Sequence, residues 1–161
     1  MQKITPFLWF DNQAEEAMNF YVSIFKNSKI LGVQRYGAEG ADASGRKQGS
    51  VMTASFQLNG QEFVVLNGGP VYKITPAISF VVNCETQAEV DEMWAKLTAG
   101  GEEVQCGWLI DKFGVSWQIV PVQLGKLLGD PEPAKAGRVM QAMLQMKKID
   151  IAGLQRAYDA A

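Results

Sequence analysis

An internal echo between the two halves of the chain constrains its fold more than any other feature. The Gln-Ala-Glu run at Gln13–Glu15 recurs at Gln87–Glu89, and each copy follows a strand-like run and opens a helical one. Phe20 in the first helical run stands at the same offset as Trp94 in the second. A repeat that keeps register with a strand, a helix start and an aromatic residue predicts a duplicated βαβββ unit.

Hydrophobic periodicity places the elements of the first half. Apolar residues from Ile4 to Phe10 predict a strand, and Asn12 with Glu15 has the spacing of a capping box before a helix that runs to about Phe25. The segment Gly37–Gly49, rich in Gly, Ala and Ser, is expected to be a mobile loop. Further strands are predicted at Lys29–Tyr36, Ser50–Leu58 and Glu62–Leu66, with the hairpin signal Asn59-Gly60 between the last two.

The second half repeats this order. Thr86 and Glu89 form another capping-box pattern, which predicts a helix to about Thr98. Two helical stretches close the chain at about 134–147 and 151–158. Strands are predicted at Ala77–Val82, Glu103–Ile110 and Val115–Pro121.

These elements predict an α+β fold in one domain that spans residues 1–161. Its paired βαβββ modules cover about 4–67 and 75–121, and a helical C-terminal extension covers about 131–161. Each module is expected to form a curved mixed sheet with its helix on the convex side. The two concave sides together would make a cup.

Composition narrows the classes of function. The 161 residues carry a net charge of −2 without a basic stripe, so no nucleic-acid partner is expected. No apolar run approaches the roughly 20 residues that cross a bilayer, and no signal-peptide pattern opens the chain, so we expect a cytoplasmic protein without a membrane partner. Cys84 and Cys106 are expected to be free thiols. Histidine, the commonest metal ligand and general base, is absent.

Two segments resemble a known family. Ile4–Phe10 with the helix start Ala14–Ala17 and Phe20-Tyr21, and the run Gly107–Pro121 (GWLIDKFGVSWQIVP), resemble the PhnB-like branch of the vicinal oxygen chelate superfamily. The branch carries the family name 3-demethylubiquinone-9 3-methyltransferase-like. The resemblance covers about Ile4 to Pro121 and implies the glyoxalase/bleomycin-resistance fold.

The resemblance also implies where a divalent metal would bind, with His or Glu ligands on the first and last strands of each module. The matching positions here are Thr5, Val65, Ala77 and Gln118. Val65 and Ala77 have no donor atom, Thr5 is a poor neutral ligand, and Gln118 offers one uncharged carbonyl oxygen. This set cannot offset the lost hydration of a divalent ion, so we expect neither a metal nor another cofactor.

Several residues are candidates for ligand binding, each with a structural alternative. Phe7 and Trp9 share the predicted cup face with Thr5 and could stack on a planar ligand or belong to the core. Gln118 could orient a ligand through its amide or satisfy a neighbouring backbone group. The remaining candidates are Trp108 (pocket or dimer contact), Asp111 (turn cap), Arg35 and Asn67 (ligand contact or solvated strand ends), and Val65 and Ala77 through the metal positions.

These residues leave several functions open. The chain is expected to be a metal-free protein that binds a small apolar or aromatic molecule in its cup, as a homodimer with the C-terminal helices near the interface. The alternatives are a metal-dependent enzyme of the superfamily, a metal-free enzyme, and the methyltransferase that the family name implies. Against the methyltransferase, the Gly-rich run Asn67–Pro70 is not predicted to open a helix, and no doubly wound βαβα pattern follows it.

Overall fold

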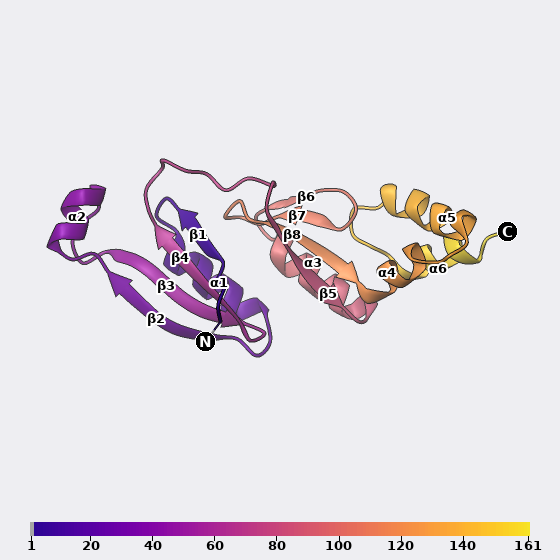
Figure 1. The fold of residues 1–161 in the computed structure, drawn as a ribbon, viewed down its shortest axis with the longest axis horizontal. Coiled ribbons are helices and arrows are strands. Elements are labelled where there is room, and N and C mark those ends of the chain that lie inside the picture. Colours follow the sequence, from indigo (N-terminus) through magenta and orange to yellow (C-terminus); the bar gives the residue numbers. More distant parts are fainter. Residues whose placement is uncertain (1) are drawn as a thin grey trace. The chain divides into compact units, whose positions relative to one another are not determined.

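The computed structural model describes residues 2–161 and divides the chain into two compact units, Met1–Ile74 and Thr75–Ala161. Each unit is described by itself, with the elements labelled in Figure 1. The first unit contains β1 (Phe7–Phe10), α1 (Ala14–Ile24), β2 (Lys29–Arg35), α2 (Ala38–Ser44), β3 (Val51–Leu58) and β4 (Gln61–Asn67). The second contains β5 (Ser79–Cys84), α3 (Gln87–Thr98), β6 (Glu102–Glu103), β7 (Trp108–Ile110), β8 (Ser116–Pro121), α4 (Val122–Leu128), α5 (Pro133–Leu144) and α6 (Ile151–Asp159).

The first unit is a four-stranded mixed sheet in the order β1-β4-β3-β2, with β1 and β4 parallel and the other pairs antiparallel. Helix α1 packs on one face, where Tyr21 stacks on Phe56 and Phe56 stacks on Phe63. Because side chains alternate along a strand, Val65 and Phe10 point to this covered face, and both are buried.

The β2–β3 connection contains a helix where a mobile loop was predicted. The run Ala38–Ser44 forms α2, with Ala41 buried and Gly45 ending the helix in the left-handed conformation. Three alanines in seven residues give this segment a helix propensity that its Gly and Ser content obscured. The prediction of a mobile loop is therefore wrong in its secondary structure.

The second unit has the same topology, β5-β8-β7-β6, with β5 and β8 parallel and the remaining pairs antiparallel. Helix α3 covers one face through the buried residues Val90, Trp94 and Leu97, and Trp117 of β8 is also buried. The predicted strand Glu103–Ile110 is instead two short strands. Cys106 and Gly107 have positive φ angles, which interrupt the extended backbone between β6 and β7.

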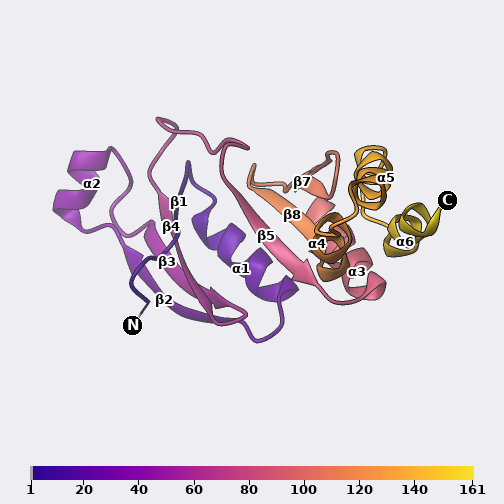
Figure 2. The same cartoon turned by 45° about the vertical axis from the view of Figure 1, so that its right-hand side comes forward.

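The chain beyond β8 forms three helices, of which α4 was not predicted. Figure 2 shows α4, α5 and α6 gathered beyond the end of β8. They enclose a cluster of buried apolar side chains, with Val120 of β8 packed against it. The members of this cluster are Leu124, Val139, Ile149 and Leu154. Among the helices of residues 2–161, none combines the length and the hydropathy needed to cross a bilayer.

Hydrogen bonds at the two helix starts test both capping-box predictions. At α3, Thr86 Oγ1 accepts from the Glu89 N–H at 3.2 Å, so that cap is confirmed. At α1, no side chain near the start caps the helix, and the Asn12–Glu15 prediction is wrong. The Ala14 N–H instead donates to Asn67 Oδ1 at 2.8 Å, so a residue of β4 caps this helix.

The predicted fold class is confirmed in its elements: two four-stranded mixed sheets, one helix on each, and C-terminal helices. Two strand starts needed correction. The first strand begins at Phe7 rather than Ile4, and β5 begins at Ser79, two residues after Ala77. Ala77 therefore lies in the exposed segment before the strand.

Candidate functional site

Each sheet has one face that lies opposite its first helix, α1 or α3, and we call these the open faces. In the first unit the open face includes Phe7 and Trp9 of β1, opposite Val64 and Leu66 of β4. Phe7 is 58% exposed, as expected for a side chain turned away from α1. The two aromatic candidates therefore lie on one face, as predicted.

Trp9 is fixed in place by the turn after β4. Its indole N–H donates to the Gly69 carbonyl at 2.9 Å, and its ring makes an edge contact with Tyr72, with centroids 5.0 Å apart. A Cβ on Gly68 would lie 2.3 Å from the indole ring, so only glycine leaves room for this tryptophan. The Gly-rich segment Asn67–Pro70 thus holds the Trp9 side chain in place. It is followed by irregular chain and not by a helix.

In the second unit the open face places Trp108 directly opposite Gln118, on the adjacent strands β7 and β8. The Gln118 Nε2 donates to the Ser79 Oγ of β5 at 2.9 Å. Val81, on the same face of β5, is 50% exposed. The sequence prediction named Gln118 and Trp108 but missed Ser79, although the parallel pairing of β5 with β8 brings them together.

The side-chain polar groups of Asn67 and Asp111 form hydrogen bonds within the protein. The Asn67 amide accepts from the Ala14 N–H and donates to the Val51 carbonyl at 3.2 Å. The buried Asp111 carboxylate accepts from the Phe113 N–H at 2.8 Å, the Val115 N–H at 3.0 Å and the Trp117 indole at 2.8 Å. These bonds fit the turn-capping alternative for Asp111.

Arg35, the remaining polar candidate, ends β2 at an exposed position. Its guanidinium donates to the Gly49 carbonyl at 3.2 Å and so closes the base of the β2–β3 connection. No contact in the described residues joins it to Phe7 or Trp9. The structure therefore groups Phe7 with Trp9 on one open face and Trp108 with Gln118 on the other. Arg35, Asn67 and Asp111 lie outside both groups.

The four positions that the resemblance gave as metal ligands do not form a donor set. Val65 is fully buried on the face covered by α1, so its predicted place on the cup face is wrong. Ala77 precedes β5, and Thr5 precedes β1, where its Oγ1 accepts from Gln2. Within residues 2–161, no group of three or more Cys, Asp or Glu side chains could hold a metal ion, and the sequence has no His.

The two cysteines are free, as predicted. Cys84 ends β5 and is fully buried. Burial raises the pKa of its thiol to about 11, with a smaller contribution from the Glu89 carboxylate. A thiol with so high a pKa is protonated at neutral pH and is a poor nucleophile.

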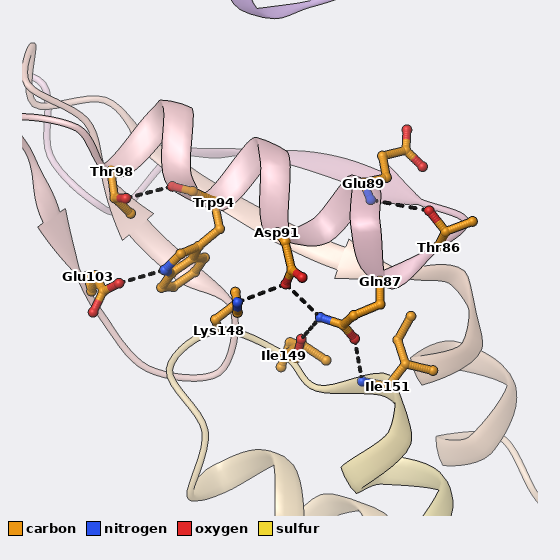
Figure 3. A network of polar contacts seen from close by, with 10 residues as sticks. All are labelled: Thr86, Gln87, Glu89, Asp91, Trp94, Thr98, Glu103, Lys148, Ile149 and Ile151. Atoms are coloured by element: carbon orange, nitrogen blue, oxygen red, sulfur yellow. Dashed lines mark hydrogen bonds and ion pairs between the residues drawn. The ribbon is translucent and has the colours of Figure 1, made fainter.

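A polar clasp holds the C-terminal helices to α3 (Figure 3). The Gln87 amide donates to the Ile149 carbonyl at 3.0 Å and accepts from the Ile151 N–H at 2.8 Å. Asp91 pairs with Lys148 at 2.8 Å, and hydrogen bonds from Lys148 and Gln87 lower the pKa of its carboxyl group. No local sequence pattern indicates the bonds from Gln87 to Ile149 and Ile151, because these residues lie far apart in the chain.

Comparisons with known proteins agree with this architecture. A family model described as 3-demethylubiquinone-9 3-methyltransferase matches residues 2–120. A solved PhnB protein from Bacillus cereus is 42% identical, covers 75% of this chain and 100% of its own, and superposes with a TM-score of 0.67. A comparison with curated protein sequences found no match.

More distant structures share the fold. A protein from Pseudomonas aeruginosa is 20% identical over 75% of this chain and 98% of its own, with a TM-score of 0.62. The fosfomycin resistance protein FosX from Listeria monocytogenes is 14% identical over 80% and 98%, with a TM-score of 0.56. The family match leaves out the residues after 120, which contain α4, α5 and α6. The matched modules confirm the resemblance seen in the sequence, and the chain belongs to the PhnB-like family described as 3-demethylubiquinone-9 3-methyltransferase.

Proposed function

We propose that the protein binds a small apolar or aromatic molecule, without a metal ion, on the open faces of its sheets. The observation that carries this proposal is the chemistry of those faces. A sheet face left to water is normally polar, yet these faces display Phe7, Trp9, Trp108 and the half-exposed Val81. Exposed apolar surface of this kind marks a binding site.

The polar groups on the same faces favour a binding role over metal chemistry. Gln118, Ser79 and Ser55 are neutral, and the carboxylates Glu62 and Glu102 lie on different sheets. A divalent ion needs several nitrogen, sulfur or carboxylate donors together, and residues 2–161 contain no such group. Of the positions that the resemblance gave as metal ligands, Val65 lies on the covered face, and Gln118 on the open face offers only an uncharged amide. Similarity to FosX at 14% identity supports the fold and carries no activity to this chain.

The family name suggests methyl transfer, which the local structure does not favour. A nucleotide-type cofactor is usually held where a Gly-rich turn follows a strand and opens a helix, so that backbone N–H groups face the ligand. After β4, the segment 68–78 contains no helix, and Gly68 serves the packing of Trp9. We therefore place methyl transfer below the binding role.

The proposal includes a homodimer, as expected from the sequence. Strand β2 lies at the edge of its sheet and exposes Ile30, Leu31 and Val33 at 48%, 44% and 38%. Apolar side chains on an unpaired edge strand support association with a second copy. Light scattering at micromolar concentration should give twice the mass of the chain, and a monomer would remove this part of the proposal.

A thermal-shift screen tests the binding role directly. The purified chain is melted with divalent metals, with chelator, and with a panel of aromatic metabolites and antibiotics, because a ligand of the folded state raises the melting temperature. We expect an aromatic compound to stabilise the chain, while metals and chelator leave the melting temperature unchanged. Stabilisation by a metal that chelator reverses would contradict the proposal and restore the enzyme alternative.

A pair of variants separates site binding from general adhesion to apolar surface. Phe7→Ala removes an aromatic side chain from the open face, and Leu144→Ala removes a similarly exposed side chain, 52% against 58%, from α5. The stabilisation by the aromatic compound should shrink in the first variant and persist in the second. Equal effects in both would show that the compound does not use the open face.

A further inference from the structure

One buried hydroxyl group on the second open face has no partner. Ser116 is 1% exposed, and its Oγ makes no hydrogen bond. Most buried polar groups in proteins are hydrogen-bonded, because an unsatisfied one costs free energy. Ser116 is therefore a position where the protein leaves a donor and an acceptor unused.

Strand register shows which groups share the face with this hydroxyl. Ser116 lies directly opposite Ser79 on β5 and two residues before Gln118 on β8, so the three side chains point to the same side of the sheet. Adjacent strands lie about 4.8 Å apart, and alternate residues of one strand about 7 Å apart. The three polar groups thus fall within the span of one small ring compound.

The hydrogen bond between Gln118 and Ser79 organises the other two members of this group. Because the Ser79 Oγ accepts from Gln118 Nε2, its own O–H can donate elsewhere, and Gln118 Oε1 remains an acceptor. Together with Ser116 the face offers two hydroxyl donors and one amide acceptor. The open-face residues of β5, β7 and β8 have no ionisable side chain: they are Ser79, Val81, Asn83, Trp108, Ile110, Ser116, Gln118 and Val120. Glu102 of β6, opposite Ile110, adds a carboxylate to this face.

The surroundings of this group limit the shape of its ligand. Trp108 lies opposite Gln118 on β7 and offers a flat apolar surface next to the amide. At the other end, Val120 packs against the apolar cluster of the C-terminal helices. The polar group is therefore bounded by an aromatic ring across the sheet and by the helical extension along β8.

We propose that Ser79, Ser116 and Gln118 form a subsite for an uncharged planar ring that carries adjacent C=O and N–H groups, such as a lactam or a cyclic amide. The C=O would accept from the two hydroxyls, and the N–H would donate to Gln118 Oε1, with the ring against Trp108. Anionic ligands are excluded, because the face has no cation to offset the lost hydration. This inference rests on the proposed binding function and names its ligand class.

The test uses three bicyclic probes on the ¹⁵N-labelled full chain. These are 2-quinolone, which carries the C=O and N–H pair, quinoline-2-carboxylate, which is charged, and naphthalene, which has no polar group. We expect 2-quinolone to bind most tightly and to shift the NMR signals of the Ser116 backbone amide, the Gln118 side-chain amide and the Trp108 indole. Loss of one hydrogen bond in Ser116→Ala should weaken 2-quinolone about three- to tenfold and leave naphthalene unchanged.

Two controls keep the result interpretable. Ser23→Ala removes an exposed hydroxyl from α1, where it donates to the Phe20 carbonyl, and should not change the affinity for 2-quinolone. Ser116→Ala should melt at the same temperature as the wild type or higher, because it removes an unsatisfied group. A clearly lower melting temperature would show that the hydroxyl has a structural partner, which would overturn the subsite.

The three probes distinguish the two proposals. If naphthalene and 2-quinolone bind equally well and Ser116→Ala changes neither, the binding function stands and the subsite is wrong. If 2-quinolone binds but shifts signals away from Ser116 and Gln118, the subsite is also wrong. If none of the probes binds, the proposed function fails and the subsite with it.

Discussion

The two units share one topology and solve the same local problems with different residues. In each, the first strand is parallel to the last, and the helix that follows the first strand needs a cap. In the first unit the cap comes from Asn67, at the end of β4. The corresponding position at the end of β8 is Pro121, whose ring offers no acceptor, and there Thr86 next to the helix supplies the cap.

The connections between the last two strands differ in the same way. Strands β3 and β4 are joined by Asn59 and Gly60, both with positive φ angles, as in a tight hairpin turn. Strands β7 and β8 are joined by a longer turn built around the buried Asp111 carboxylate. The repeated apolar pattern therefore specifies the topology, while each turn and cap is stabilised by whichever side chain lies nearby.

The largest loss of stability is expected when the buried carboxylate of Asp111 is removed. Asp111→Ala removes the acceptor for three buried donors, Phe113 N–H, Val115 N–H and the Trp117 indole. We expect the free energy of unfolding to fall by about 3–5 kcal/mol, because hydrogen bonds to a charged group are strong and their buried donors stay unsatisfied. Urea unfolding followed by tryptophan fluorescence measures this loss.

Asn59→Ala is the matched change in the first unit. Asn59 is exposed and contributes its tolerance of positive φ, so we expect a loss of about 1 kcal/mol. Asp111→Asn provides a milder variant, in case Asp111→Ala does not fold, and should lie between the two. Similar losses for Asp111→Asn and Asn59→Ala would contradict the view that the two turns are stabilised differently.

The two units also show which features of the fold could be predicted from the sequence alone. The succession of strands and helices along the chain and the pairing of two similar modules follow from periodicity. A repeated apolar pattern must be buried in the same way twice. The caps and clasps do not follow, because Asn67 reaches Ala14 and Gln87 reaches Ile149 across long sequence separations. Helix α2 was hidden by its Gly and Ser content, and α4 by its short span directly after β8.

For the open faces, alternation along the strands identified Phe7 with Trp9 and separated Gln118 from Trp117. The resemblance alone placed Val65 on the cup face, and the strand register shows that this placement is wrong. Ser116 could have been found from the sequence, since it lies two residues before Gln118 on the same strand. Ser79, opposite Ser116, follows from the parallel pairing of β5 with β8, which the sequence pattern does not specify.

The second test uses the repeated Gln-Ala-Glu run itself. Gln87 binds the backbone of the C-terminal segment twice, whereas Gln13 at the same place in the first unit is exposed and caps nothing. Gln87→Ala should lower the free energy of unfolding by about 1–2 kcal/mol, as expected for two hydrogen bonds, and Gln13→Ala should stay within about 0.5 kcal/mol. Hydrogen exchange at the Ile151 amide should accelerate only in Gln87→Ala.

Limited proteolysis near 145–150 gives an independent measurement of the same clasp. Faster cleavage in Gln87→Ala than in the wild type would show that the C-terminal helices open from α3 while the sheet stays folded. Equal exchange and cleavage in Gln87→Ala and Gln13→Ala would mean that the apolar cluster alone holds the extension. The repeat would then have the same structural role in both units.

The smallest expected effect appears only at high pH and only in the second unit. Phe10 and Cys84 end the first strands of the two units and are both buried, but only the thiol can ionise. Its pKa is raised from the ordinary 9.0 to about 11, so between those values the unfolded chain loses this proton first. The folded state then binds more protons, and stability falls as the pH rises.

The fall attributable to Cys84 should amount to about 1 kcal/mol between about pH 8 and pH 10, and it should be absent below pH 8. Cys84→Ala should lose this part of the pH dependence, whatever its stability at neutral pH. Cys106→Ala should keep it, which assigns the effect to the buried thiol of Cys84. If the free energy of unfolding depended on pH in the same way in Cys84→Ala and Cys106→Ala, water would reach the Cys84 thiol at the end of β5. The ends of β1 and β5 would then differ in burial.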